Sequence, residues 1–438
     1  MINRSDLRKK ILLLVEQYGD DKSDNTKFVE GKTVIPPSGK FIGGNEMKMM
    51  TEAVLDGWLT TGRFNDQFEN KIAQYLGVRH VLTTNSGSSA NLLAFSALTS
   101  DKLGERRIKS GDEVITVAVA FPTTVNPIIQ NNCIPVFVDV DIPTYNIDVG
   151  MLEEALSEKT RAIMLAHTLG NPFNVEAVKD FADKNNLWLI EDCCDALGSE
   201  YKGRKVGSFG DIGTVSFYPA HHITTGEGGA VFTNNTKLKK IIESFRDWGR
   251  DCYCKPGLDN TCNNRFSRQL GKLPNGYDHK YTYSHIGYNL KITDMQAACG
   301  LAQFDRLEYF TKTRKDNFQY FTEKLKLLER YLILPKATKY TSPSWFGYPI
   351  IIKENIDMKL VDLVAYLDKF NIGSRLIFAG NITKQPYFNK CKFKIIGTLD
   401  NTDLIMNKGF WLGVYPGIDR KKIDYVVNKL NDFLSKID

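Results

Sequence analysis

Short runs of apolar residues alternate with amphipathic stretches through the middle of the chain. Seven of these runs are spaced as strands, at residues 80–83, 113–117, 136–139, 162–165, 187–191, 213–217 and 229–232. Stretches with helical periodicity, such as residues 90–98 and 175–185, lie between them. Strands that alternate with helices are typical of an α/β fold with a doubly wound parallel sheet. Ligands of such sheets bind beyond the carboxyl ends of the strands, so residues at those ends are the first candidates for a site.

The same pattern divides the chain into three parts. Residues 1–40 form an N-terminal helical extension, residues 41–292 carry the predicted strands as a large domain, and residues 293–438 form a smaller α+β domain. Within the large domain, residues from about 247 to 283 are polar, contain several glycines and prolines, and show no clear period. A stretch of this kind indicates a long ordered insertion or loop.

Composition narrows the class of protein. A formal charge of +6 on 49.6 kDa is too weak for a nucleic-acid-binding protein, although it suits a small anionic substrate. The longest early apolar run, at residues 11–15, is far too short to span a membrane. Eight cysteines in 438 residues do not indicate a secreted disulfide framework, because such frameworks belong to small domains. We therefore expect a cytoplasmic globular enzyme that binds neither nucleic acid nor membrane.

Three segments place polar chemistry at predicted strand ends. Residues 84–91 lie between a strand and a helix, where backbone N–H groups can cradle a phosphate, although such a serine and glycine cluster is also an ordinary turn and cap. Asp192 ends another strand, where a carboxylate can pair with a protonated pyridine nitrogen or cap a helix. Ser216 and His221 add a hydroxyl and an imidazole at a third strand end.

Together with residues 57–62, 120–127 and 287–298, these segments resemble the fold-type I, aspartate-aminotransferase-like family of sugar aminotransferases and dehydratases. The resemblance covers nearly all of residues 40–438 and implies a mostly parallel seven-stranded sheet with pyridoxal or pyridoxamine phosphate (PMP) as cofactor. The cofactor-binding residues that it implies are Asp192 for the pyridine nitrogen, Phe121 for ring stacking, and Gly87, Ser88 and Ser216 for the phosphate. It also implies a homodimer with shared active sites, because Asn289 would reach the phosphate of the neighbouring subunit.

His221 stands where aminotransferases of this family have the lysine that forms an internal Schiff base with the cofactor. Since an imidazole forms no stable imine, we expect the cofactor to bind noncovalently in its amine form, with His221 as a base of ordinary pKa near ~6.5. Asp195 and Tyr218 flank the cofactor by family position and complete the predicted catalytic group. The alternative is a chain that has lost both the lysine and its activity.

Four cysteines form a pattern that suggests a metal centre. Cys252, Cys254 and Cys262 lie in the polar insertion, and Cys194 follows Asp192 by two residues. Four thiolates suit either a structural zinc ion or a [2Fe–2S] cluster, and the residues alone leave both open. The resemblance favours the cluster, because the spacing matches the branch of nucleotide-sugar 3-dehydratases that pairs pyridoxamine phosphate with [2Fe–2S].

The resemblance implies a reaction as well. The C3 hydroxyl of a CDP-linked 4-keto-6-deoxyhexose would be removed in 3,6-dideoxysugar (O-antigen) biosynthesis, and an NADH-dependent flavin/iron–sulfur reductase would supply electrons. The cytosine base rests on the resemblance alone. Two alternatives stay open: a cluster-free dehydratase or aminotransferase with a structural zinc, and a noncatalytic sensor that retains the cofactor pocket.

Overall fold

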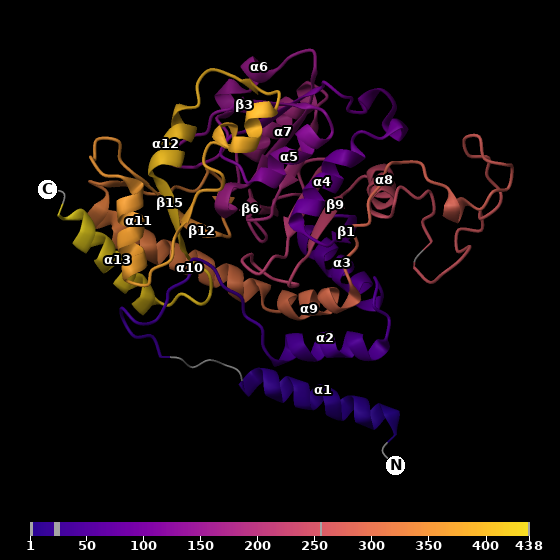
Figure 1. Cartoon of the computed structure of the whole chain (residues 1–438), viewed down its shortest axis with the longest axis horizontal. Coiled ribbons are helices and arrows are strands. Elements are labelled where there is room, and N and C mark those ends of the chain that lie inside the picture. Colours follow the sequence, from indigo (N-terminus) through magenta and orange to yellow (C-terminus); the bar gives the residue numbers. More distant parts are fainter. Residues whose placement is uncertain (1–2, 22–26, 255, 437–438) are drawn as a thin grey trace.

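The computed structural model, which describes residues 3–21, 27–254 and 256–436, is built around a mostly parallel sheet of eight strands (Figure 1). In spatial order the strands are β1 (His80–Thr84), β9 (Gly229–Thr233), β8 (Ile212–Ser216), β5 (Trp188–Asp192), β4 (Thr160–Ala166), β2 (Glu113–Val117), β3 (Ile134–Val138) and β14 (Lys394–Ile395). Only the pairings of β9, with β1 and β8, are antiparallel. The seven predicted strands are present, and the α/β fold is confirmed. The two-residue strand β14 adds one strand that the sequence did not predict.

Helices cover both faces of this sheet (Figure 1). One face packs against α4 (Gly87–Ala97) and α8 (Thr236–Arg246), and the other against α3 (Arg63–Leu76), α7 (Val175–Lys184) and α9 (Asp294–Phe304). Strand β5 begins with an apolar run because both of its faces are buried. Trp188 and Ile190 pack on the side of α4 and α8, and Leu189 packs on the side of α3, α7 and α9. The two short helices α5 (Pro122–Gln130) and α6 (Leu152–Ala155) complete this domain.

A second, smaller unit has its own core. Its antiparallel sheet has the order β10 (Leu332–Ile333), β12 (Gly347–Ile352), β15 (Gly409–Gly413) and β13 (Arg375–Leu376). The helices of this unit are α10 (Leu307–Leu325), α11 (Leu360–Lys369), α12 (Asp400–Lys408) and α13 (Arg420–Leu434). The predicted domain boundary at residue 292 falls just before α9, which packs in the core of the large domain. A three-stranded sheet of β11 (Thr341–Ser342), β6 (Glu200–Tyr201) and β7 (Arg204–Lys205) joins the two units.

The N-terminal part of the chain lies along the outside of both units. Helix α1 (Arg4–Asp21) packs on α2 (Gly44–Asp56), and α2 packs on α9 (Figure 1). In the segment that connects α1 to α2, Ile35 is buried in the core of the smaller unit and forms a parallel bridge with Ile372. The predicted N-terminal extension therefore contains one helix and an extended segment. This segment packs in a core that is otherwise formed by residues near the other end of the sequence.

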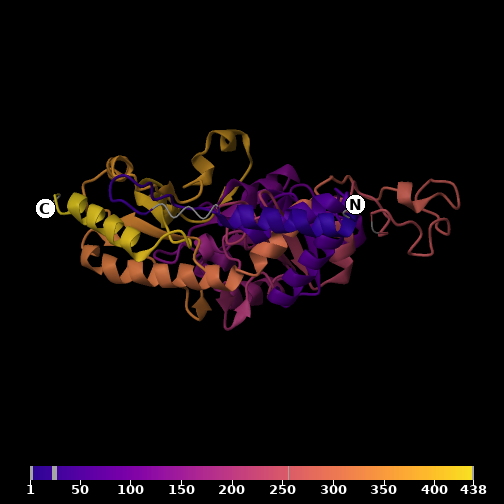
Figure 2. The same ribbon diagram turned by 90° about the horizontal axis from the view of Figure 1, so that it is seen from below.

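The predicted insertion projects from the large domain beyond α8 (Figures 1 and 2). Two isolated bridges, Asp247 with Asn289 and Arg250 with Tyr283, pair the two chain segments at its base. Among its described residues, one 3₁₀ turn at His279–Tyr281 is the only regular element from 251 to 281. The described part of the insertion is therefore held by turns, isolated backbone hydrogen bonds and side-chain contacts.

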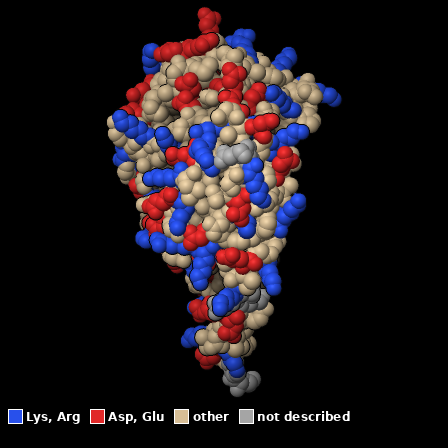
Figure 3. Space-filling model, turned by 90° about the vertical axis from the view of Figure 1, so that its left-hand side faces the viewer, with Lys and Arg blue, Asp and Glu red and all other residues tan. Residues whose placement is uncertain are grey.

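The distribution of charge agrees with the weak positive excess of the sequence. Lysine and arginine side chains are interspersed with aspartate and glutamate over the face shown in Figure 3. Within the described part of the chain, no helix combines the length and the apolar character that a membrane span requires.

Candidate active site

The phosphate cradle predicted after β1 forms where this strand end meets the end of β8. Ser86 caps α4, since its Oγ accepts a hydrogen bond from the Ser89 N–H at 3.0 Å. Gly87 lies directly against Ser216, and a Cβ atom on Gly87 would come within 2.4 Å of the Ser216 Cβ. Ser88 is exposed beside them, with its Oγ 3.2 Å from the Thr123 hydroxyl. Gly87, Ser88 and Ser216 are therefore neighbours at the N-terminus of a helix, where an anion is favoured.

Asp192, at the end of β5, is buried and held by three donors. Its Oδ2 atom accepts hydrogen bonds from Asn91 Nδ2 and Thr124 Oγ1, both at 2.7 Å. Its Oδ1 atom accepts one from the backbone N–H of Cys194 at 3.0 Å. Asn91 is oriented in turn by the Thr214 hydroxyl, which donates to its Oδ1 at 2.6 Å. The network fixes the carboxylate in one orientation, as a partner for a charged pyridine nitrogen requires.

Asp195, which is buried, and His221, whose side chain is 15% exposed, lie beside this carboxylate. Their Nδ1 and Oδ1 atoms lie 3.4 Å apart without hydrogen-bond geometry. Burial, together with the charge of Arg314, lowers the pKa of His221 to about 4. Burial and the charge of Asp192 raise the pKa of Asp195 to about 8. At neutral pH, His221 is therefore an unprotonated base next to a protonated acid, so the ordinary pKa that the sequence predicts for His221 is corrected.

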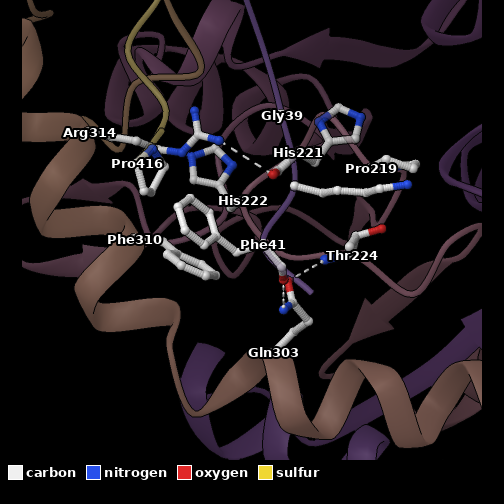
Figure 4. Close-up of a pocket in the computed structure, with 11 residues that line it drawn as sticks. Gly39, Phe41, Pro219, His221, His222, Thr224, Gln303, Phe310, Arg314 and Pro416 are labelled. Carbon is white, nitrogen blue, oxygen red and sulfur yellow. Dashed lines mark hydrogen bonds between the residues drawn. The ribbon is translucent and has the colours of Figure 1, made fainter. Parts of the chain in front are cut away.

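Figure 4 shows the pocket behind His221, which lies between the two units of the fold. Arg314 of α10 is almost completely buried and donates to the backbone carbonyls of Trp345, Phe346 and His221, at 3.3, 3.1 and 3.4 Å respectively. These contacts hold a positive charge close to the imidazole. His222 points elsewhere, with its Nε2 atom 2.7 Å from the Ser344 carbonyl oxygen, and is a structural residue.

The remaining predicted site residues lie at the surface of this region. Phe121 lies directly before α5 and is 52% exposed. Tyr218 precedes His221 on the same loop and is 50% exposed. The Tyr218 carbonyl accepts the His221 N–H at 2.9 Å, so the two side chains share one turn. Asn289 is exposed at the base of the insertion, and the next residue, Leu290, accepts a hydrogen bond from Asn85 beside the phosphate cradle.

Three of the four predicted metal ligands lie in the insertion, in the neighbourhood of His279. The ligand atoms of Cys252, Cys254 and His279 lie within 4.8 Å of one another, and Cys262 Sγ lies 3.3 Å from His279 Nε2. Cys194 lies at the end of β5, where burial and the charge of Asp192 raise the pKa of its thiol well above the usual value. Three of the predicted cysteines thus cluster with a histidine in the insertion.

Sequence reasoning missed several residues of the site. Asn91 and Thr124 lie within the motifs that carry the family resemblance, but only the folded chain shows that both bind Asp192. Arg314 follows His221 by 93 residues and carries no local signal. His279 was detectable in principle, because it is a histidine within the same polar insertion as three cysteines.

The fold is that of the fold-type I enzymes, a class to which enzymes dependent on pyridoxal phosphate (PLP) belong. Residues 40–431 match the DegT/DnrJ/EryC1/StrS aminotransferase family, and the chain belongs to that family. The predicted kinship with sugar aminotransferases and dehydratases is confirmed.

Two relatives and one solved structure show how close this kinship is. The chain is 64% identical over 429 residues, 98% of each chain, to the lipopolysaccharide biosynthesis protein RfbH of Salmonella typhimurium. It is 50% identical to the dTDP-4-dehydro-2,6-dideoxy-D-glucose 3-dehydratase of Saccharopolyspora spinosa, over 98% of this chain and 93% of the relative. The structure matches that of E. coli GDP-4-keto-6-deoxy-D-mannose-3-dehydratase with bound hydrated PLP at a TM-score of 0.81 and 30% identity, covering 90% and 99% of the two chains.

The residues present fit this cofactor. The backbone at Gly87 leaves no room for a side chain, and Asp192 is oriented at the end of β5, the strand next to β8. Two buried atoms, His221 Nδ1 and Asp195 Oδ2, have no hydrogen-bond partner among the residues that the structure describes. Such atoms are costly unless a bound group satisfies them. The site therefore has a phosphate cradle, a carboxylate and an unpartnered base.

Proposed function

We propose that the protein removes the C3 hydroxyl of a nucleotide-linked 4-keto-6-deoxyhexose, with pyridoxamine phosphate bound noncovalently and His221 as the base. The observation that carries the proposal is the neutral imidazole at the position where aminotransferases of the family have their lysine. The names of two relatives support it, since the 50% identical protein and a 31% identical E. coli protein are both nucleotide-sugar 3-dehydratases.

The roles of the residues follow from their positions. When bound, the cofactor supplies an amine that links to the C4 ketone and a ring that accepts electrons. Asp192 keeps the proton on the ring nitrogen, and the cradle around Gly87 and Ser216 holds the phosphate. With the cofactor bound, the neutral His221 would be the group that accepts a proton near the amine of the cofactor and would deliver a proton to the C3 hydroxyl, which would leave as water. Asp195 stays protonated beside His221 below about pH 8 and orients it.

The dehydrated sugar must gain two electrons to become the 3-deoxy ketone. We propose that cysteines of the insertion would hold a [2Fe–2S] cluster, which would supply one-electron transfer, and that a separate NADH-dependent flavin/iron–sulfur reductase would be the source of the electrons. The clustering of Cys252, Cys254 and Cys262 supports a metal centre in the insertion, and the spacing of the cysteines supports iron–sulfur over zinc. Anaerobically purified protein should be brown and contain iron and sulfide, whereas zinc without iron would refute the reductive step.

For the substrate we propose a CDP-linked sugar, which makes the activity that of a CDP-6-deoxy-L-threo-D-glycero-4-hexulose-3-dehydrase. The resemblance in cysteine spacing is its only support. The test compares kcat/KM for CDP-, GDP- and dTDP-linked 4-keto-6-deoxyhexoses. Preference for CDP is expected, and turnover of another nucleotide at equal or higher kcat/KM would refute the choice of base.

Noncovalent binding of the cofactor is tested by borohydride. Treatment of the PLP form should leave no cofactor attached to the chain, whereas His221→Lys should be labelled. Lys40 lines the pocket beside His221, so peptide mapping should examine that residue first. Label on Lys40 or any other lysine of the wild-type chain would contradict the proposal.

The proposed homodimer shares its sites through Asn289. Because Asn289 is exposed, a partner chain can reach it, and the family resemblance implies that it binds the phosphate held by that partner. A heterodimer of Asn289→Ala and Asp192→Ala chains should then contain one complete site and recover activity. Failure of this heterodimer to recover activity above that of either homodimer would refute cross-subunit binding.

A further inference from the structure

The extended segment between α1 and α2 contributes a lysine to the pocket beside His221. Figure 4 shows Gly39 and Phe41 of this segment at the pocket, and Lys40, between them in the sequence, is a lining residue as well. Lys40 is exposed, and its side chain has no ion-pair or hydrogen-bond partner in the described part of the chain. It therefore supplies an unpaired ammonium group to the exposed side of the pocket that contains the proposed base.

The backbone before Lys40 is held by the smaller unit. Gly39 packs against the ring of Tyr415, and a Cβ atom on Gly39 would come within 2.6 Å of the Tyr415 Cε2 atom. The same ring atom lies against Gly417, where a Cβ atom would come within 2.4 Å of it. The Tyr415 ring is thus packed tightly against two glycines, and no larger residue fits at position 39. The chain is fixed directly before the lysine.

The backbone after Lys40 is tied to the loop that carries His221. Gln303, which is buried, donates from Nε2 to the Phe41 carbonyl at 2.7 Å. The Oε1 atom of Gln303 accepts the backbone N–H of Thr224 at 3.3 Å, and Thr224 lies on the same loop as His221. One side chain therefore holds both the segment of Lys40 and the loop of the proposed base. The position of the lysine is set before any ligand binds, which lowers the cost of binding.

The charges around the pocket favour an anion. None of the described residues that line it is an aspartate or a glutamate. The second cation of the lining, Arg314, is almost completely buried, and its two terminal nitrogens already bind backbone carbonyls. Lys40 and Phe41 are the exposed members of the lining, so an anionic group that enters the pocket meets the Lys40 charge without a competing carboxylate.

We propose that Lys40 binds the diphosphate of the nucleotide-sugar substrate. The class of substrate rests on the proposed function, whereas the position of the charge rests on the fixed backbone on both sides of Lys40. In a nucleotide-linked 4-keto sugar the diphosphate is attached to C1, across the ring from C4. With C4 at the amine of the cofactor, the diphosphate points away from the cofactor and towards the exposed part of the lining. A lysine suits this role, because its ammonium is a mobile point charge for phosphate oxygens.

The experiment measures the binding of CDP, GDP and dTDP to the full-length, PLP-loaded protein by calorimetry. Lys40→Met should weaken binding of the nucleoside diphosphate that the wild type prefers at least about tenfold, because a charge-assisted contact is lost. Lys40→Arg keeps the charge and should restore most of the affinity. Added NaCl should weaken binding by the wild type more steeply than binding by Lys40→Met.

Two controls separate this contact from others. Lys32→Met alters an exposed lysine of the same segment that does not line the pocket, and it should bind nucleoside diphosphates as the wild type does. Affinity for PLP, measured by absorbance titration, should be unchanged in Lys40→Met, because the cofactor phosphate is expected at Gly87 and Ser216. A tenfold loss of PLP affinity would assign Lys40 to the cofactor phosphate and overturn the proposal.

Turnover separates an anchor from a role in the chemistry. In Lys40→Met the KM for the nucleotide sugar should rise at least about tenfold while kcat changes by less than about twofold. A fall in kcat at unchanged KM, or wild-type affinity of this variant for nucleoside diphosphates, would overturn the anchor even if dehydration is observed. Binding of nucleoside diphosphates that depends on Lys40, in a protein that dehydrates no 4-keto sugar, would support the anchor and refute only the proposed function.

Discussion

Acidification from pH 7.5 to 5.5 should leave the proton transfer by His221 almost unchanged. With a pKa of about 4, roughly 97% of the imidazole remains neutral at pH 5.5. With an ordinary pKa of ~6.5, only about 10% would be neutral. Exchange of solvent hydrogen into the reacting carbon of the cofactor depends on the neutral base, so its rate should fall by less than about 1.2-fold rather than about tenfold.

The exchange rate is measured with substrate present and without a reductase, so that the metal centre is not involved. The pKa itself is measured by NMR of the ring nitrogens in ¹⁵N-histidine-labelled protein, in which six histidines must be resolved. His221→Asn assigns the signal by its disappearance and should abolish exchange. A tenfold loss of exchange by pH 5.5, with a His221 signal that titrates near ~6.5, would refute the effect of burial and of Arg314.

The same pKa shift makes a prediction about stability. Because the pKa of His221 is lower in the folded chain than in the unfolded chain, folding favours the neutral form. The stability that this group contributes is present above ~6.5 and is lost as the pH falls towards 4. Between pH 6.5 and 5.5 it should lower the free energy of unfolding by about 1 kcal/mol. Urea titrations of His221→Asn should lack this component, and equal losses in the variant and the wild type would contradict the assignment.

Two substitutions test the cofactor site. Thr124→Val removes one of the donors to Asp192 and should weaken cofactor binding by about 10- to 100-fold, measured by absorbance titration. Thr116→Val alters a buried hydroxyl that has no hydrogen-bond partner among the described residues and should have little effect. Equal effects of the two variants would argue against the network. Gly87→Ala forces a Cβ atom against Ser216, so it should reduce cofactor affinity and lower the free energy of unfolding by about 1–3 kcal/mol. Urea titration measures the loss of stability. Wild-type affinity and stability in this variant would contradict the tight cradle.

The parts of the fold that the sequence predicted are those with a local signal. Each of the seven strands is a short apolar run because both faces of the sheet are covered by helices. Strand β14 carries no such signal: Lys394 and Ile395 are exposed and pair with β3 only because the fold of the smaller unit brings them there.

The site divides in the same way. Asp192, Gly87 and His221 lie in contiguous motifs at strand ends, where residue type and spacing are sufficient to propose a role. The pKa of His221 could not be predicted, because it depends on burial and on Arg314 from a helix far along the chain. Likewise, the spacing in the sequence grouped Cys194 with the three cysteines of the insertion, whereas the structure shows those three cysteines close to His279.

The bridge between Ile35 and Ile372 sets an order of events during synthesis of the protein. The two residues are separated by about 340 residues, and ribosomes add about 5–20 residues per second, so Ile35 emerges roughly 15–70 s before its partner. During that time its apolar side chain has no core in which to pack, even if the strands of the large sheet are already assembling. Closure of the smaller unit therefore waits for the synthesis of residue 372, and a ribosome that stops before it leaves the N-terminal segment exposed to proteases and chaperones.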